Sequence, residues 1–256
     1  MESTSKPKRK RWLQFGIRTI LILMFLVTLA IVVVRPVIQR RNAVRYLQST
    51  WHVVEMRDEK EWTFKDRVLV FLFGEEAGPV EKVEVVELDS APESVKAIAR
   101  LTELKKLHLC FYYDDVDHQP FRALKNLEVL TSDTVRIKDC SFLTACKNLK
   151  TIRLGESEIG VDLSVFGELP NLESLKIWLT DLEITNESFD KLCNATSLKT
   201  LDLEYSFELG TVTDFRPLIK LKQLKELKGV LNPGSESDQE FIKLLPPDCA
   251  VSFPDD

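Results

Sequence analysis

Residues 169–177 read LPNLESLKI, a segment in which apolar and polar residues alternate near its end. Leu175 and Ile177 are two residues apart, and side chains two apart on a β-strand point to the same face. Lys176 lies between them and points to the opposite face. The segment therefore predicts a short strand with one apolar face and one polar face.

The same frame recurs along the chain. Further copies are LTELKKLHL (101–109), LKNLEVL (124–130), LKTIRL (149–154), LKTLDL (198–203) and LKQLKEL (221–227), with vaguer copies at VEVVEL (83–88) and CAVSF (249–253). The residues that begin each apolar pair are Val86, Leu107, Leu130, Ile152, Leu175, Leu201, Leu227 and Val251. Successive positions are 21 to 26 residues apart. So narrow a spacing predicts a repeat array in which one strand per repeat stacks on the next.

Short helical stretches are expected between these strands, on the return to the next strand. The segments are ESVKAIARL, CSFLTACK, DLSVFGEL, NESFDKLC, DFRPLIKL and DQEFIKLL. Their apolar residues recur at helical spacing, as Phe189, Leu192 and Cys193 do. No single repeat can bury its own apolar face, so we expect the stacked repeats to share one continuous core.

On these motifs, residues 81–253 resemble the leucine-rich-repeat family, whose repeats are roughly 20–29 residues long. The resemblance implies an α/β solenoid with parallel strands on one face and short helices on the other, and it implies no catalytic residues. The family pattern L-x-x-L-x-L-x-x-N-x-L has an asparagine that is replaced here by Tyr112, Ser157, Thr180 and Ser206. We therefore expect the asparagine ladder to be absent. The serines and threonine resemble an irregular bacterial type, notably the small membrane-anchored leucine-rich-repeat proteins of planctomycete bacteria.

The N-terminus differs sharply in charge from the rest of the chain. Residues 1–35 hold seven bases and one acid, whereas the remainder holds 28 bases and 39 acids, a formal charge of −11. Such an acidic body argues against nucleic acid as a partner, because phosphates require cations. Residues 20–34, ILILMFLVTLAIVVV, contain twelve Leu, Ile, Val or Phe. They predict a transmembrane helix at 16–38, behind a basic tail at 1–15.

Two other interpretations of this apolar stretch stay open: a cleaved signal peptide and a buried helix of a soluble protein. The stretch ends in Val34, Arg35 and Pro36 without a small-x-small cleavage site, which favours an uncleaved signal anchor. Six bases precede the apolar core, counting Arg18, and four follow it. The positive-inside rule then places the N-terminus in the cytoplasm and the C-terminal domain outside, in a single-pass membrane protein.

Residues 39–80 are expected to form a linker and an N-terminal cap, ahead of the solenoid at 81–253. Within them, residues 41–49 predict a short helix and residues 51–56 predict a strand. Residues 68–77, VLVFLFGEEA, predict a buried helix or strand that seals the first repeat from water, because the ends of a solenoid need capping.

The chain lacks the phosphate-binding glycine motifs, the HExxH zinc motif and the GxSxG nucleophile motif, and we expect no cofactor. The densest polar cluster, Asp114 to His118, fits a solvated loop better than a metal site, since its order matches no known ligand spacing. His108 and Cys110 point to the same side of a strand, but catalysis also needs an orienting group and an oxyanion site. Five cysteines do not indicate a disulfide framework, although a Cys140–Cys146 bridge stays open.

The outward side of the strands is the surface on which a partner is expected. The residues in register there are Glu87, His108, Thr131, Arg153, Lys176, Asp202 and Lys228. The candidate interaction surface consists of Trp178, Tyr205, His108, Arg153, Lys176 and Asp202. Trp178 and Tyr205 are its expected anchors, because these residue types are enriched in interface hot spots. In the alternative interpretation, Trp178 only covers the edge of its strand.

The sequence thus favours a membrane-tethered leucine-rich-repeat protein whose non-catalytic surface binds a protein or an envelope component. This hypothesis rests on the fold, which presents an extended surface. The alternative is an enzyme or enzyme subunit with a site on the 105–120 loops.

Overall fold

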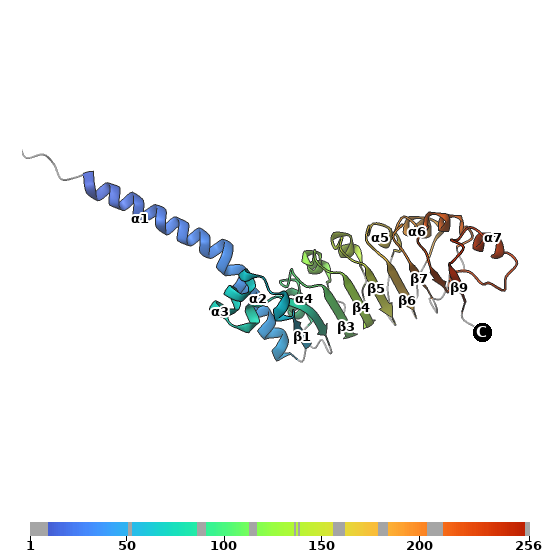
Figure 1. Cartoon of the computed structure of the whole chain (residues 1–256), viewed down its shortest axis with the longest axis horizontal. Helices are drawn as coiled ribbons and strands as arrows, with labels where there is room; N and C mark the ends of the chain where they lie inside the picture. The colour runs from blue at the N-terminus through green and yellow to red at the C-terminus, as the bar shows by residue number, and fades with distance from the viewer. Residues whose placement is uncertain are drawn as a thin grey trace, which may run out of the picture.

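The computed structural model describes residues 10–50, 53–85, 91–112, 117–135, 137, 139–155, 162–178, 184–203 and 212–253. Within this part of the chain the strands form one sheet, in which they lie side by side in chain order (Figure 1). They are β1 (Val53–Met56), β2 (Val80–Val85), β3 (Lys106–Tyr112), β4 (Val129–Val135), β5 (Thr151–Gly155), β6 (Ser174–Trp178), β7 (Thr200–Asp202), β8 (Glu226–Lys228) and β9 (Ala250–Ser252). β1 and β2 are antiparallel, and each later pair of neighbours is parallel. The predicted array of stacked strands is confirmed.

The repeated leucines form one continuous row across the sheet. The aligned and buried residues are Leu107, Leu130, Ile152, Leu175, Leu201 and Leu227. Burying a side chain of this size stabilises the fold by roughly 1.5–3 kcal/mol. The row therefore holds neighbouring repeats together and sets their register, because a slip of one residue would turn every leucine to solvent.

The first parallel strand follows a different frame from the predicted one. Val83, which is fully buried, is aligned with Leu107, so the array begins at Val83 and not at Val86. Residues 83–88 allow two alternations of apolar residues, one from Val83 and one from Val86. The structure takes the first, in which β1 covers the outer edge of β2 with Val54 opposite Val83. Glu87 lies outside the described residues.

The predicted return segments are confirmed as short helices, which lie along one side of the sheet (Figure 1). They are α4 (Ala91–Ile98), η5 (Ser141–Ala145), α5 (Ser164–Gly167), α6 (Asn186–Leu192), η7 (Arg216–Lys220) and α7 (Gln239–Ile242), together with η4 (Gln119–Ala123), for which no helix was predicted. η4, η5 and η7 are single 3-10 turns. Such tight turns suit segments of five residues that only have to reverse the chain.

One phenylalanine from each of six successive returns packs into the space between helices and sheet. This phenylalanine row consists of Phe121, Phe142, Phe166, Phe189, Phe215 and Phe241. Ring centroids are 5.9 Å apart for Phe121 and Phe142 and 5.5 Å apart for Phe189 and Phe215, both edge to face. This arrangement adds about 0.5–1.5 kcal/mol to the burial of each pair. The row is a second repeated core element, and the sequence analysis missed it.

Asparagine side chains form a ladder at a position of the repeat other than the one in the family pattern, to which the prediction referred. The side-chain amide of Asn126 donates to the carbonyl of Thr102 (2.9 Å), that of Asn148 to Lys125 (2.9 Å), and that of Asn171 to Lys147 (2.8 Å). In the next repeat the hydroxyl of Ser197 donates to the carbonyl of Pro170 (2.8 Å). Each bond ties a turn to the turn of the preceding repeat. The side chains expected to replace the ladder lie outside the described residues.

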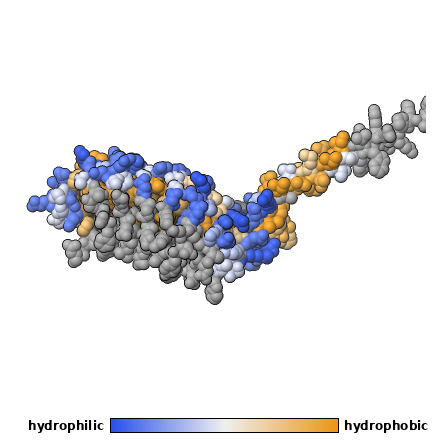
Figure 2. Space-filling model, turned by 180° about the vertical axis from the view of Figure 1, so that it is seen from behind, coloured by the Kyte–Doolittle hydropathy of each residue, from blue (hydrophilic) through white to orange (hydrophobic). Residues whose placement is uncertain are grey.

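The N-terminal segment is one continuous helical rod made of α1 (Lys10–Leu29), the π-helical turn η1 (Ala30–Val34) and α2 (Arg35–Ser49). The helix continues past Pro36, which lacks a backbone N–H and lies at the start of α2, directly after the π-helical turn in which the hydrogen-bonding pattern changes. The apolar residues of α1 from Ile17 to Leu29 are exposed, and Figure 2 shows a hydrophobic surface that projects from the solenoid. The helix is long and apolar enough to cross a membrane, and a signal sequence would have the same properties.

α2 docks directly onto the first repeat, where Ala43, Val44 and Leu47 are buried in the solenoid core. The expected strand at 51–56 is β1. Residues 68–77 fall in α3 (Phe64–Phe73) and η3 (Glu75–Ala77), but the expectation that they are buried is wrong for α3. Phe71 is 87% exposed and Leu72 is 61% exposed. α2 and β1 seal the first repeat instead, which leaves the outer face of α3 uncovered.

A capping box begins α3. The carboxylate of Asp66 accepts hydrogen bonds from the backbone N–H (2.9 Å) and the hydroxyl (2.7 Å) of Thr63. Burial raises the pKa of Asp66, but these hydrogen bonds and the charges of Arg57 and Arg40 lower it, and the net pKa is below its usual value. Asp66 is therefore ionised at neutral pH, where it stabilises the first turn of the helix.

Candidate binding surface on the strand face

The outward side chains of the parallel strands form two neighbouring rows. The first row consists of His108, Thr131, Arg153, Lys176, Asp202, Lys228 and Ser252, which are aligned from β3 to β9. The second row, two residues further along each strand, consists of Cys110, Asp133, Gly155 and Trp178. We call both rows together the strand face. It includes five of the six residues of the predicted interaction surface, while Tyr205 lies outside the described residues.

Trp178 lies flat across the neighbouring strand. A Cβ built on Gly155 would be 2.3 Å from Cε2 and Cζ2 of the indole ring, so the ring occupies the space above this glycine. Gly155 is aligned with Trp178 and is followed in the row by Asp133. The absence of a side chain at position 155 thus lets the indole lean toward β4. Trp178 is partly buried, and part of its ring forms the surface of the second row.

Charges on the first row are partly neutralised within the row. Lys176 Nζ is 3.1 Å from Asp202 Oδ2, and Asp202 is only 8% exposed. This pair braces β6 against β7, and little of Asp202 is left for a partner. Arg153 differs: its side chain is exposed, and within the described part of the chain it has no carboxylate within ion-pair distance. Among the described residues of the predicted surface, Arg153 alone is exposed, and Trp178 on the adjacent strand is partly exposed.

Four polar side chains meet at the β3 end of the strand face. His108 and Cys110 on β3 lie opposite Thr131 and Asp133 on β4. Cys110 Sγ is 2.6 Å from His108 Nε2, and Asp133 Oδ2 is 3.8 Å from the same nitrogen. The other ring nitrogen, Nδ1, shares a hydrogen bond with the hydroxyl of Thr131. The predicted contact of His108 with Cys110 is present. Asp133 was not predicted to join them. Its position two residues after Thr131, on the outward side of the strand, was the available signal.

Three of the other four cysteines are not available for chemistry. Cys140, Cys146 and Cys193 are buried and free, so the structure does not form the Cys140–Cys146 bridge. Burial raises the thiol pKa to about 12 for Cys140, about 11 for Cys146 and about 12 for Cys193. These thiols stay protonated and act as small apolar groups in the core.

The acidic cluster of the sequence is divided. Positions 114–116 lie outside the described residues. Asp117 accepts a hydrogen bond from the backbone N–H of Gln119 (2.9 Å), which begins the 3-10 turn η4. His118 is 4% exposed, and its ring lies 5.8 Å from that of Phe121 and 6.1 Å from that of Phe142. His118 therefore belongs to the start of the phenylalanine row.

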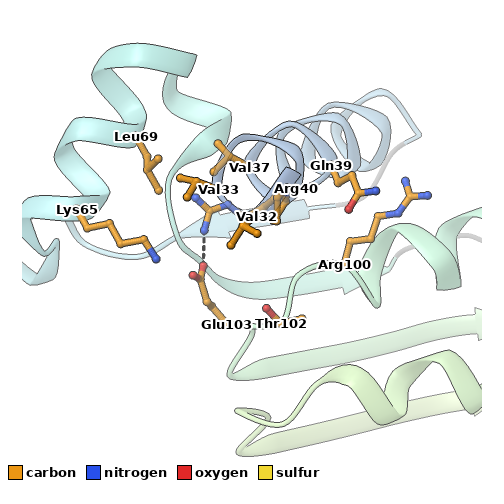
Figure 3. A pocket seen from close by; sticks show the side chains of 11 residues that line it. Val32, Val33, Val37, Gln39, Arg40, Lys65, Leu69, Arg100, Thr102 and Glu103 are labelled. Carbon is orange, nitrogen blue, oxygen red and sulfur yellow. Dashed lines mark hydrogen bonds and ion pairs between the residues drawn. The ribbon is translucent and has the colours of Figure 1, made fainter. Parts of the chain in front are cut away.

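A pocket of about 400 Å³ lies where the N-terminal rod meets the solenoid (Figure 3). Its lining combines the apolar side chains of Val32, Val33, Val37 and Leu69 with the charged side chains of Arg40, Lys65, Arg100 and Glu103. Arg40 Nη1 is 2.5 Å from Glu103 Oε2, and Nη2 of the same guanidinium donates to the carbonyl of Ala77. This single side chain joins α2 to both the cap and the first repeats.

Comparison with known proteins relates the chain to solved structures alone: no protein-family model matches it, and no curated protein matches it. Internalin F of Listeria monocytogenes is 24% identical, with a TM-score of 0.50 over 63% of this chain and 46% of that protein. Internalin C2 of the same organism is 18% identical (TM-score 0.47, 68% of this chain, 81% of that one). A leucine-rich-repeat protein of Leptospira interrogans is 25% identical (TM-score 0.47, 60% of this chain, 38% of that one).

The sheet topology and the likeness to internalin F define the class: the chain has an α/β leucine-rich-repeat fold. It spans less than half the length of that internalin. The closer resemblance to planctomycete proteins stays a prediction.

Proposed function

We propose that the protein is a membrane-tethered, non-catalytic binding module whose strand face binds a protein partner of the cell envelope. The arrangement of Trp178 above Gly155 beside the exposed Arg153 is the observation that carries this proposal. Tryptophan and arginine together are the residue types most enriched in interface hot spots. An accessible guanidinium beside an indole fits a protein segment that carries a carboxylate next to an apolar side chain.

Two features at the other end of the molecule support the membrane tether. The apolar side chains of α1 from Ile17 to Leu29 are all exposed in the part of the chain that the structure describes. α3, at the base of the rod, exposes Phe64, Phe71 and Leu72. Aromatic and aliphatic side chains at such a place are typical of a helix that rests on the bilayer interface. We infer that α1 spans the membrane, that α3 lies at its surface, and that the solenoid is outside the cytoplasm.

The tether predicts the outcome of a protease test on intact cells that carry a C-terminal tag. We expect loss of the tag and retention of a short N-terminal fragment in the membrane fraction, because the solenoid is exposed and α1 is not. Lysed cells provide the control for protease activity. A protected tag would reverse the orientation, and a tag that is free in the soluble fraction would mean that the apolar helix is a cleaved signal.

The binding surface predicts that Trp178→Ala combined with Arg153→Ala lowers partner capture by at least about tenfold, since a hot-spot residue contributes roughly 2 kcal/mol or more. The measurement is quantitative mass spectrometry of proteins retained by the tagged full chain from solubilised membranes. Arg122→Ala, an exposed arginine in η4 on the helix side, is the matched control. Equal capture by the double variant and the wild type would refute this choice of surface.

A further inference from the structure

We propose that His108, Cys110 and Asp133 form a binding site for a divalent transition-metal ion of the zinc class. The three ligand atoms, Nε2, Sγ and a carboxylate oxygen, all lie within 4.8 Å of one another. The site lies on the strand face, but it includes neither Trp178 nor Arg153, so metal binding can be tested without the proposed protein partner.

The backbone places these side chains together. His108 and Cys110 are two residues apart on β3 and therefore point to the same face. Asp133 is aligned with Cys110 on β4, and Thr131 is aligned with His108. Neighbouring strands are about 4.8 Å apart and residues two apart on a strand are roughly 6.6 Å apart, so the four side chains start from the corners of a small rectangle. Two paired parallel strands, and not a loop, hold the ligands.

The donor set fits zinc. Imidazole nitrogen, thiolate sulfur and carboxylate oxygen are its three protein ligand types, with bonds of roughly 2.0–2.3 Å. A tetrahedral ion would hold its ligand atoms about 3.3–3.6 Å apart. To bind such an ion, the distance between Cys110 Sγ and His108 Nε2 would have to increase from 2.6 Å. The distance between Asp133 Oδ2 and His108 Nε2 would have to decrease from 3.8 Å. Side-chain rotations suffice for both shifts, because the three groups lie at the surface.

Thr131 supplies the supporting contact that zinc-binding histidines need. Its hydroxyl is hydrogen-bonded to His108 Nδ1. When Nδ1–H donates to this hydroxyl, the lone pair of Nε2 is directed toward Cys110 and Asp133, where the ion would bind. Such a contact fixes the tautomer and the orientation of the ring. Thr131 is thus a positioning residue and does not touch the ion.

Three protein ligands leave one position of a tetrahedral ion open. His108, Cys110 and Asp133 are all at least partly exposed, so water can occupy this position. Cys110 would bind as the thiolate and release its proton to solvent. A site with three ligands and one water differs from a closed structural zinc site, and the fold does not depend on it.

The test is a titration of the full chain, in detergent and under reducing conditions, with Co²⁺ and then with Zn²⁺ in competition. We expect one equivalent of Co²⁺ to bind, with the visible bands of tetrahedral cobalt and a thiolate-to-cobalt charge-transfer band. Zn²⁺ should displace it. Cys110→Ser should abolish the charge-transfer band, and Asp133→Asn should weaken binding by at least about tenfold. Thr131→Val should weaken it roughly 10- to 100-fold while the spectrum keeps its thiolate band.

Cys249→Ser is the matched control, because Cys249 is also partly exposed but lies in the last repeat. It should leave both spectrum and affinity unchanged. Circular dichroism melting of each variant reports whether it is folded. A charge-transfer band that persists in Cys110→Ser, or that disappears in Cys249→Ser, would overturn the proposal, as would octahedral cobalt spectra without a thiolate band.

Discussion

Phe142→Ala is expected to lower the free energy of unfolding by about 3–5 kcal/mol, the usual cost of removing a buried phenylalanine. Phe142 is 1% exposed and contacts both Phe121 and His118 within the phenylalanine row. The substitution leaves a cavity between the helices and the sheet that neighbouring rings cannot fill, because each belongs to a different repeat. Chemical denaturation of the full chain, followed by circular dichroism, measures the effect.

The matched control is Phe71→Ala, which removes the same side chain from an exposed position in α3. Its cost should stay within roughly 0.5 kcal/mol, as is usual for surface positions. Equal destabilisation by the two substitutions would mean that the row does not contribute to the core. If the row holds the repeats together, Phe142→Ala should also reduce the cooperativity of unfolding, because a solenoid is stabilised by contacts between neighbours.

Gly167→Ala is expected to destabilise the protein by roughly 1–3 kcal/mol or more through overpacking. A Cβ at Gly167 would lie 1.9 Å from the carbonyl oxygen of Lys191 and 2.7 Å from its carbon. Both atoms belong to the backbone of α6, so the clash cannot be relieved by a change of rotamer. α5 and α6 would have to separate, although methyl addition is otherwise among the mildest of substitutions.

Gly16→Ala provides the comparison, since a Cβ there would have no atom within 4 Å. We expect it to leave the thermal midpoint unchanged, whereas Gly167→Ala should lower it by several degrees for a domain of this size. An unchanged midpoint for Gly167→Ala would show that the two helices are not packed as closely as the structure places them.

The repeat frame was predictable because leucine alternation carries most of the core energy and recurs at a regular distance. The first strand was misplaced because its valines fit two alternations, and only the antiparallel pairing of β1 distinguishes them. Asn126, Asn148 and Asn171 recur at one place in the frame, so their ladder was visible in principle. The family pattern directed attention to another position.

The polar sites were harder to predict than the core. The acidic residues at 114–118 are dense in the sequence, whereas Asp133 is 23 residues from Cys110 and meets it through strand alignment alone. The packing of Trp178 over Gly155 also depends on strand alignment. A glycine does not indicate which side chain will cover it until the neighbouring strand is known. The exposure of α3 could not be anticipated either, because its composition is typical of a buried helix.

The helical rod runs without a break from α1 through η1 into α2, so it can transmit force between the apolar helix and the solenoid. The C-terminal end of the rod packs into the solenoid core through Ala43, Val44 and Leu47, and Arg40 forms an ion pair with Glu103. No flexible joint interrupts residues 10–50. A force on the solenoid would therefore be transmitted through α2 and η1 to the apolar helix α1. If α1 is the proposed membrane anchor, a pull on a partner bound to the strand face would tilt α1 in the bilayer.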